Sequence, residues 1–177
     1  MEPPSLKAVM DAMSAWPRPS TADVGLRVYA PTFERLLTEA AIGMLDLIAS
    51  PQGVQTAQQL QRHTATWAIE SPSDYGDRDM LLVTWLDEVL YRLEIHHQWL
   101  VDALIMVRET GNKPPSIEVQ VSWVDGDNIE RELEIKAVTT HELSVAFVEA
   151  GETMNSPWAT VPSMSGPGWS ADVLFDI

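Results

Sequence analysis

Apolar residues in this chain recur with two different periods, and this combination restricts the fold more than any other feature. Residues 33–48 and 81–93 carry apolar side chains at the three- and four-residue steps of a helix that buries one face. Shorter segments alternate apolar and polar residues, as half-buried strands do; these are residues 24–30, 64–70, 101–107, 116–124, 129–135, 143–148 and 169–177. Helices among mostly hairpin-linked strands predict an α+β fold.

The chain has room for one domain. Its 177 residues are 45% hydrophobic, which suits a single core better than two. We predict a two-layer domain over residues 20–177, with two amphipathic helices packed on a mostly antiparallel or mixed sheet of about six strands. Residues 1–19 contain four prolines and are expected to form an extended lead-in, with a short helix over residues 6–13. Residues 71–77 are expected to form a loop, and residues 150–168 a long one.

Composition excludes several classes of protein. The chain contains no cysteine, so it has no disulfide, thiolate metal site or cysteine nucleophile. No apolar run approaches the roughly 18 residues of a membrane-spanning helix. The first residues lack the basic start and apolar run of a signal peptide. We therefore expect a cytoplasmic protein.

The charge balance is strongly acidic. Aspartate and glutamate number 26 against 11 lysines and arginines, which gives a formal net charge of −15. Because proteins bind nucleic acids largely by neutralising phosphates with basic side chains, we expect no direct nucleic-acid binding. Acidity of this size suits metal cations or a basic protein partner. The alternative is that it only keeps the protein soluble.

Motifs of common catalytic and metal sites are missing. The four histidines are not paired at the spacing of a zinc site on a helix; they are His63, His96, His97 and His141. The stretch "SGPG" lacks the Lys-Ser/Thr of a phosphate loop, and no serine stands in a Gly-x-Ser-x-Gly elbow. Abundant carboxylates remain as the candidate functional groups.

Two of these carboxylates stand at strand ends. Asp23 precedes the first alternating segment, whereas Asp176 and Ile177 end the last one. If those strands are neighbours, two side-chain carboxylates and the α-carboxylate of Ile177 converge. Such oxygen donors favour Ca²⁺, Mg²⁺ or Mn²⁺ over zinc. That convergence would also explain why the chain stops at Ile177, since one more residue would turn the terminal carboxylate into an amide.

Four segments together are similar to the archease family: "STADVGLRVYAPTFERLLTEAAIGMLDLI" (20–48), "DMLLVTWLDEVLYRLE" (79–94), "LEIKAVTTHELSV" (133–145) and "ADVLFDI" (171–177). Members of that family typically read His-Thr-Ala-Asp-Val-Gly, Leu-Leu-x-x-Trp-Leu-x-Glu-x-Leu-Tyr and Lys-Ala-Val-Thr-Tyr-His, and end in Asp-Ile. The order and the spacing agree over roughly half of the residues. The chain departs from the pattern at Ser20, where the family has histidine, and at Thr140, where it has tyrosine.

The resemblance implies an activator rather than an enzyme. Archease assists an RtcB-type RNA ligase, which seals broken RNAs and tRNA halves after transferring GMP from GTP to its own histidine. It speeds formation of the ligase–GMP intermediate and allows multiple turnover. The family's metal site corresponds to Asp23, Asp176 and Ile177, with Ca²⁺ as the first choice and Mg²⁺ or Mn²⁺ as alternatives, and its activating lysine corresponds to Lys136.

Alternatives to this reading stay open. Asp23 and Asp176 could serve a metal-dependent hydrolase, although catalysis would need a positioned base or nucleophile beside the ion. The protein could also be a general chaperone-like interaction protein with no obligatory metal. Lys136 stands among glutamates, so a local salt bridge is its simpler role. His141 matches the family motif, and its simpler role is a hydrogen bond within the sheet.

Overall fold

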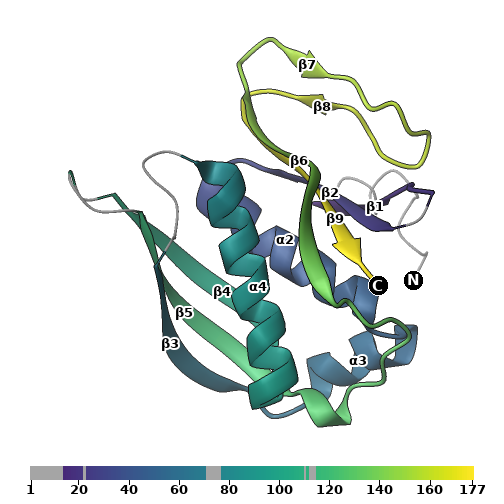
Figure 1. The fold of residues 1–177 in the computed structure, drawn as a ribbon, viewed down its shortest axis with the longest axis vertical. Coiled ribbons are helices and arrows are strands. Elements are labelled where there is room, and N and C mark those ends of the chain that lie inside the picture. Colours follow the sequence, from purple (N-terminus) through teal and green to yellow (C-terminus); the bar gives the residue numbers. More distant parts are fainter. Residues whose placement is uncertain (1–13, 22, 71–76, 110, 112–114) are drawn as a thin grey trace, which may run out of the picture.

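The computed structural model describes residues 14–21, 23–70, 77–109, 111 and 115–177. The short helix predicted for residues 6–13 and nearly all of the loop predicted for 71–77 lie outside this range. The described elements are β1 Ala15–Arg18, β2 Val24–Ala30, α2 Phe33–Ile48, α3 Pro51–Gln59, β3 His63–Glu70, α4 Arg78–His96, β4 Gln98–Arg108, β5 Ser116–Asp125, the 3₁₀ turn η1 Gly126–Asn128, β6 Ala137–Val148, β7 Thr153–Met154, β8 Met164–Ser165 and β9 Gly168–Asp176 (Figure 1).

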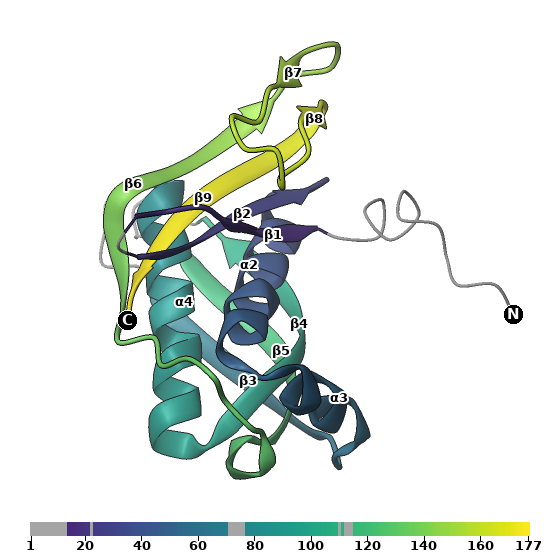
Figure 2. The ribbon, with the colours of Figure 1, turned by 90° about the vertical axis from the view of Figure 1, so that its right-hand side faces the viewer.

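The predicted α+β class is confirmed. The strands are divided between separate antiparallel sheets, so the single sheet and the two layers that we predicted are corrected. One sheet has the order β1-β2-β9-β6 and another β3-β5-β4, while β7 and β8 form a small hairpin within the stretch predicted as a long loop. Helices α2 and α4 contact each other and strands of both larger sheets, so they lie between the sheets (Figures 1 and 2). One continuous core therefore joins the three layers.

Capping residues set the ends of the two long helices. Thr32 caps α2 by accepting a hydrogen bond from the Arg35 amide at 3.2 Å, and Asp77 caps α4 by accepting one from Met80 at 3.1 Å. The indole Nε1 of buried Trp85 donates to the Leu37 carbonyl at 2.8 Å and ties α4 to α2. Both predicted helices are confirmed.

A third helix, α3, follows α2 at once. Ser50 caps it by accepting from the Gly53 amide at 2.9 Å, and Pro51 occupies its first turn, where proline costs no hydrogen bond. The stretch "SPQG" therefore starts a helix as well as ending one. The sequence analysis predicted a helix over residues 33–48 and no helix directly after it.

Residues 129–135 do not form the predicted strand. Ile129 and Ile135 are buried, as their alternation indicates, but the backbone makes only an isolated bridge between Arg131 and Ala49. The amide of Glu132 donates to the Ile48 carbonyl at 2.9 Å, at the C-terminal end of α2. The alternating pattern predicted correctly which side chains are buried. The backbone amides of this segment, however, donate to the C-terminal end of α2 and not to a neighbouring strand.

Strand β1 lies within residues 1–19, the predicted lead-in. It pairs with β2 as the edge strand of the four-stranded sheet, with Trp16 opposite Arg27. Pro17 is tolerated there because an edge strand leaves one row of amides unpaired. The sheet therefore begins at Ala15, ahead of the predicted domain start at residue 20.

No helix among the described residues combines the length and the apolar character needed to cross a membrane.

Candidate functional site

Strand register brings the sequence-predicted site residues to one end of the four-stranded sheet. Strands β2 and β9 are antiparallel neighbours with Val24 opposite Phe175, so the next opposed positions are Asp23 and Asp176. On the other side of β9, Ala137 of β6 lies opposite Asp176. Lys136 directly precedes Ala137, and the end of β9 lies at the start of β6 (Figure 2).

Lys136 is hydrogen-bonded to the end of β9 through both its backbone and its side chain. Its amide donates to the Asp176 carbonyl at 2.8 Å, and its Nζ donates to an Ile177 oxygen at 3.1 Å. Lys136, Asp176 and Ile177 are exposed, and Asp23 is half-buried. The lysine therefore contacts the strand end, and none of the ion pairs in the described part of the chain joins it to the neighbouring glutamates.

The chemistry of these donors fits a hard divalent cation. Two carboxylates and a main-chain oxygen are the ligand types that Ca²⁺, Mg²⁺ and Mn²⁺ prefer. Across the described residues, no three or more His, Cys, Asp or Glu side chains are grouped as a metal site would require. The chain would thus supply part of a coordination shell, and other oxygens would complete it.

Each histidine has a different environment. His63 stacks on Trp123 at 4.5 Å between ring centroids, and His96 meets Tyr91 edge-on at 5.2 Å. His97 takes a left-handed conformation at the end of α4 and lies 2.8 Å from a carboxylate oxygen of Asp127. These contacts give the three histidines structural roles.

Three motif positions lie on or near this sheet: His141, which matches the family, and Thr140 and Ser20, which depart from it. His141 is exposed on β6, and its Nε2 lies 3.9 Å from a carboxylate oxygen of Glu142. Its side chain therefore contacts Glu142 instead of making the hydrogen bond within the sheet that we considered for it. Thr140 is its exposed neighbour, within the register shift between Thr139 and Ser144. Ser20 is exposed in the connection from β1 to β2.

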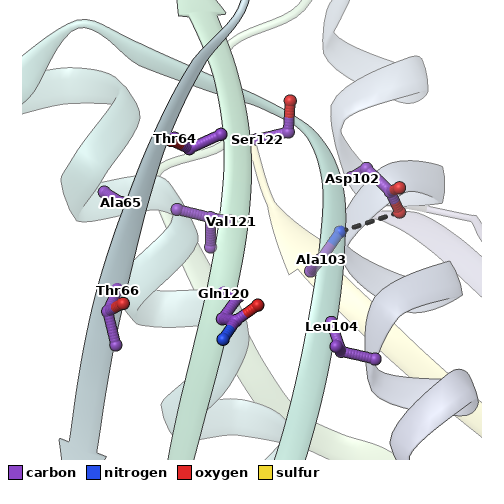
Figure 3. A pocket seen from close by; sticks show the side chains of 9 residues that line it. All are labelled: Thr64, Ala65, Thr66, Asp102, Ala103, Leu104, Gln120, Val121 and Ser122. Atoms are coloured by element: carbon purple, nitrogen blue, oxygen red, sulfur yellow. Dashed lines mark hydrogen bonds between the residues drawn. The ribbon is translucent and has the colours of Figure 1, made fainter.

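A groove of about 560 Å³ crosses the outer face of the other sheet (Figure 3). Small, polar and apolar side chains from β3, β4 and β5 line it; they are Thr64, Ala65, Thr66, Asp102, Ala103, Leu104, Gln120, Val121 and Ser122. Asp102 is its one ionisable side chain, and that carboxylate accepts a hydrogen bond from the Ala103 amide at 2.9 Å. The lining offers no acid–base pair.

Two aspartates of α4 face the edge strand β6, a placement that sequence reasoning missed. The carboxylate of Asp79 lies near the Val145 backbone and that of Asp87 near the Val138 backbone. Partial burial raises the pKa of both carboxyls, and the nearby backbone groups oppose the rise. Both aspartates lie in the sequence motif, but nothing local in the sequence indicates that they face this strand.

Comparison with known proteins gives a consistent result. The model of the Archease protein family matches residues 17–177. Protein archease of Methanopyrus kandleri is 32% identical over 127 residues, covering 71% of this chain and 84% of the relative. Protein archease of Methanosarcina barkeri is 26% identical over 163 residues, covering 89% and 91%.

The fold has a counterpart among solved structures. The solution structure of Methanobacterium thermoautotrophicum protein 1598 matches with a TM-score of 0.57 and 19% identity, over 93% of this chain and 99% of that one. This likeness concerns the fold alone. The match of the family model over nearly the whole chain carries the assignment, and the chain belongs to the archease family.

Proposed function

We propose that this protein activates an RtcB-type RNA ligase in the cytoplasm, promoting ligase guanylylation and multiple turnover in tRNA splicing or RNA repair. The proposal rests on membership of the archease family and on the activity that the family resemblance implies. One structural observation supports it above others. Lys136 and Asp176, two of the positions matched to the family's functional residues, are hydrogen-bonded to each other at the end of the sheet.

In this proposal Asp23, Asp176 and Ile177 hold a divalent cation, with Ca²⁺ as first choice and Mg²⁺ or Mn²⁺ as alternatives. Bound there, the cation supplies positive charge at an acidic strand end, where it attracts phosphate oxygens. The exposure of Asp176 and Ile177 leaves one side of this strand end open to a partner. Oxygens of water, the nucleotide or the ligase would fill the rest of the shell.

Lys136 has two roles in this proposal. Its hydrogen bonds to Asp176 and Ile177 fix the end of β9 against β6 and so orient the donors. Its ammonium also supplies a positive charge at an otherwise acidic tip, where the triphosphate of GTP would approach. The acidic balance of the whole chain suits association with a basic RNA-handling enzyme.

The test is formation of ligase–GMP by the cognate RtcB-type ligase with GTP and Mn²⁺, with and without this protein. We expect marked acceleration by the wild type, loss of it in Asp176→Ala, and no loss in Asp127→Ala, a matched exposed aspartate in η1 beside the C-terminal end of α4. A wild-type protein that leaves the rate unchanged would overturn the proposed function. Acceleration that persists in Asp176→Ala would show that activation does not depend on the proposed metal site.

A further inference from the structure

The outward face of the four-stranded sheet collects buried polar atoms without hydrogen-bond partners. Of eight such side-chain atoms in the described part of the chain, five lie on this sheet; they are Trp16 Nε1, Arg18 Nε, Arg18 Nη1, Arg27 Nη1 and Thr139 Oγ1. Four of the five can only donate. A concentrated excess of buried donors indicates a missing acceptor, because buried polar groups are normally paired.

Strand register places these groups on one face of the sheet, and the Arg18 side chain reaches across that face to Glu142 of β6. Arg18 lies opposite Gly25, Gly25 opposite Leu174, and Leu174 opposite Thr139, so one row crosses all four strands. Arg27 is two residues beyond Gly25 on the same face of β2, because alternate residues of a strand share a face. The guanidinium carbons of Arg18 and Arg27 lie 4.8 and 4.7 Å from the ring centroid of Trp158. One indole ring therefore borders both guanidinium groups.

Each arginine is bound to one carboxylate and keeps free donors. Arg27 donates from Nε and Nη2 to Asp172, with the Nε bond at 2.7 Å, and Arg18 donates from Nη2 to Glu142. The Asp172 hydrogen bond raises the pKa of Arg27, which stays charged. The arginine side chains are only 8% and 11% exposed, for Arg27 and Arg18, whereas the Glu142 side chain is 50% exposed. Glu142 is thus the partner that can leave most easily.

We propose that Arg18, Arg27 and Thr139 form a binding site for a phosphate group. A phosphate accepts several hydrogen bonds and carries no N–H donor, and arginine is the side chain best suited to bind it with paired donors. On binding, the phosphate takes the place of the Glu142 carboxylate on Arg18. This exchange keeps the local charge balanced while it satisfies the free guanidinium donors.

The Trp158 ring covers this site by packing against both guanidinium groups. Its half-buried ring lies in the 150–168 segment, which is held to the sheet by a hydrogen bond from the Tyr29 hydroxyl to the Pro162 carbonyl at 2.9 Å. Because the ring lies against both buried guanidinium groups, we expect phosphate binding to shift it. Fluorescence of Trp158 therefore reports binding, and the difference between wild type and Trp158→Phe isolates its signal from that of the other tryptophans.

The test titrates the full chain in EDTA at constant ionic strength, so that no divalent cation at Asp23 and Asp176 contributes. The probes are inorganic phosphate, GTP, and one oligoribonucleotide with either a 3′-phosphate or a 3′-hydroxyl. We expect a saturable change in Trp158 fluorescence with at least one phosphate probe and none with the 3′-hydroxyl RNA. The probe that binds tightest identifies the source of the phosphate group.

Three variants make the test specific. Arg18→Lys should weaken binding about tenfold or more, since it removes charge-assisted hydrogen bonds. Glu142→Gln should strengthen it, because the competing carboxylate is gone, and a misfolded protein would not give that gain. Arg108→Lys, at an exposed arginine on the other sheet, should change nothing. The absence of saturable binding by the wild type would overturn the proposal, as would equal affinity in Arg18→Lys and Glu142→Gln.

Discussion

At the scale of single residues, Lys136 and a cation at the strand end compete for the same Ile177 oxygen. The Lys136 Nζ lies 3.1 Å from that oxygen. We predict that Lys136→Met, which keeps the length of the side chain and removes its charge, binds Ca²⁺ or Mn²⁺ more tightly than the wild type. Calorimetric titration measures this affinity.

The same variant should fail to accelerate ligase–GMP formation, because the positive charge near the approaching triphosphate is lost. Tighter metal binding together with lower activation separates the two roles of Lys136. A variant that loses metal affinity instead would show that Lys136 only holds the strand end in place.

Asp46 gives the protein a predictable pH dependence. Partial burial raises the pKa of its carboxyl, and repulsion from Glu39 raises it further. Because the pKa of Asp46 is higher in the folded state than in the unfolded state, its carboxyl group stabilises the folded state at pH values below the ordinary aspartate pKa. That contribution is lost as the pH rises through the raised value.

We therefore predict that Asp46→Asn raises the free energy of unfolding at pH 7, since the amide carries no charge to desolvate. The gain should shrink toward zero as the pH falls below about 4, where both states of the wild type are protonated. Urea denaturation of both proteins at pH 7 and pH 3.5 measures the difference. An equal gain at both pH values would assign the effect to packing rather than to titration.

At the scale of elements, β6 is an edge strand whose amides are partly covered by α4. The Asp87 carboxylate lies near the Val138 backbone, one position from Ala137 opposite Asp176. We predict that Asp87→Ala lowers the free energy of unfolding by about 1 kcal/mol and speeds hydrogen exchange at Val138. Asp87→Asn keeps an acceptor oxygen and should retain most of the protection. Equal exchange at Val138 in both variants would contradict this role.

The elements that followed from the sequence were those with strong local patterns. Periodicity located both long helices, and alternation located most strands. Alternation misassigned residues 129–135, because it reports which side of a segment is buried and not which backbone receives its hydrogen bonds. Strand β1 was missed because Pro17 within it argues against a strand unless the edge position is known.

At the scale of the whole molecule, the candidate site is a product of topology. Asp23 and Asp176 are far apart in the chain, and only the antiparallel pairing of β2 and β9 makes them neighbours. The residues alone singled out these carboxylates at two strand ends but left the pairing of the strands open, and the family resemblance implied the same positions. The arginine cluster carried no sequence signal, since its members and Trp158 come from separate strands and a loop.

That topology also implies that both large sheets unfold together. Helix α4 lies between them, and its Leu86 is fully buried in the shared core. We predict that Leu86→Ala costs about 2–5 kcal/mol, as truncations of buried leucine do. Hydrogen-exchange protection should then fall by the same factor in β5 and in β9. Leu104→Ala, at a side chain 63% exposed on the outer face, should change stability by less than about 0.5 kcal/mol. Loss of protection confined to β5 would mean that the sheet carrying Asp23 and Asp176 is stable without the other, and that the two layers form separate folding units.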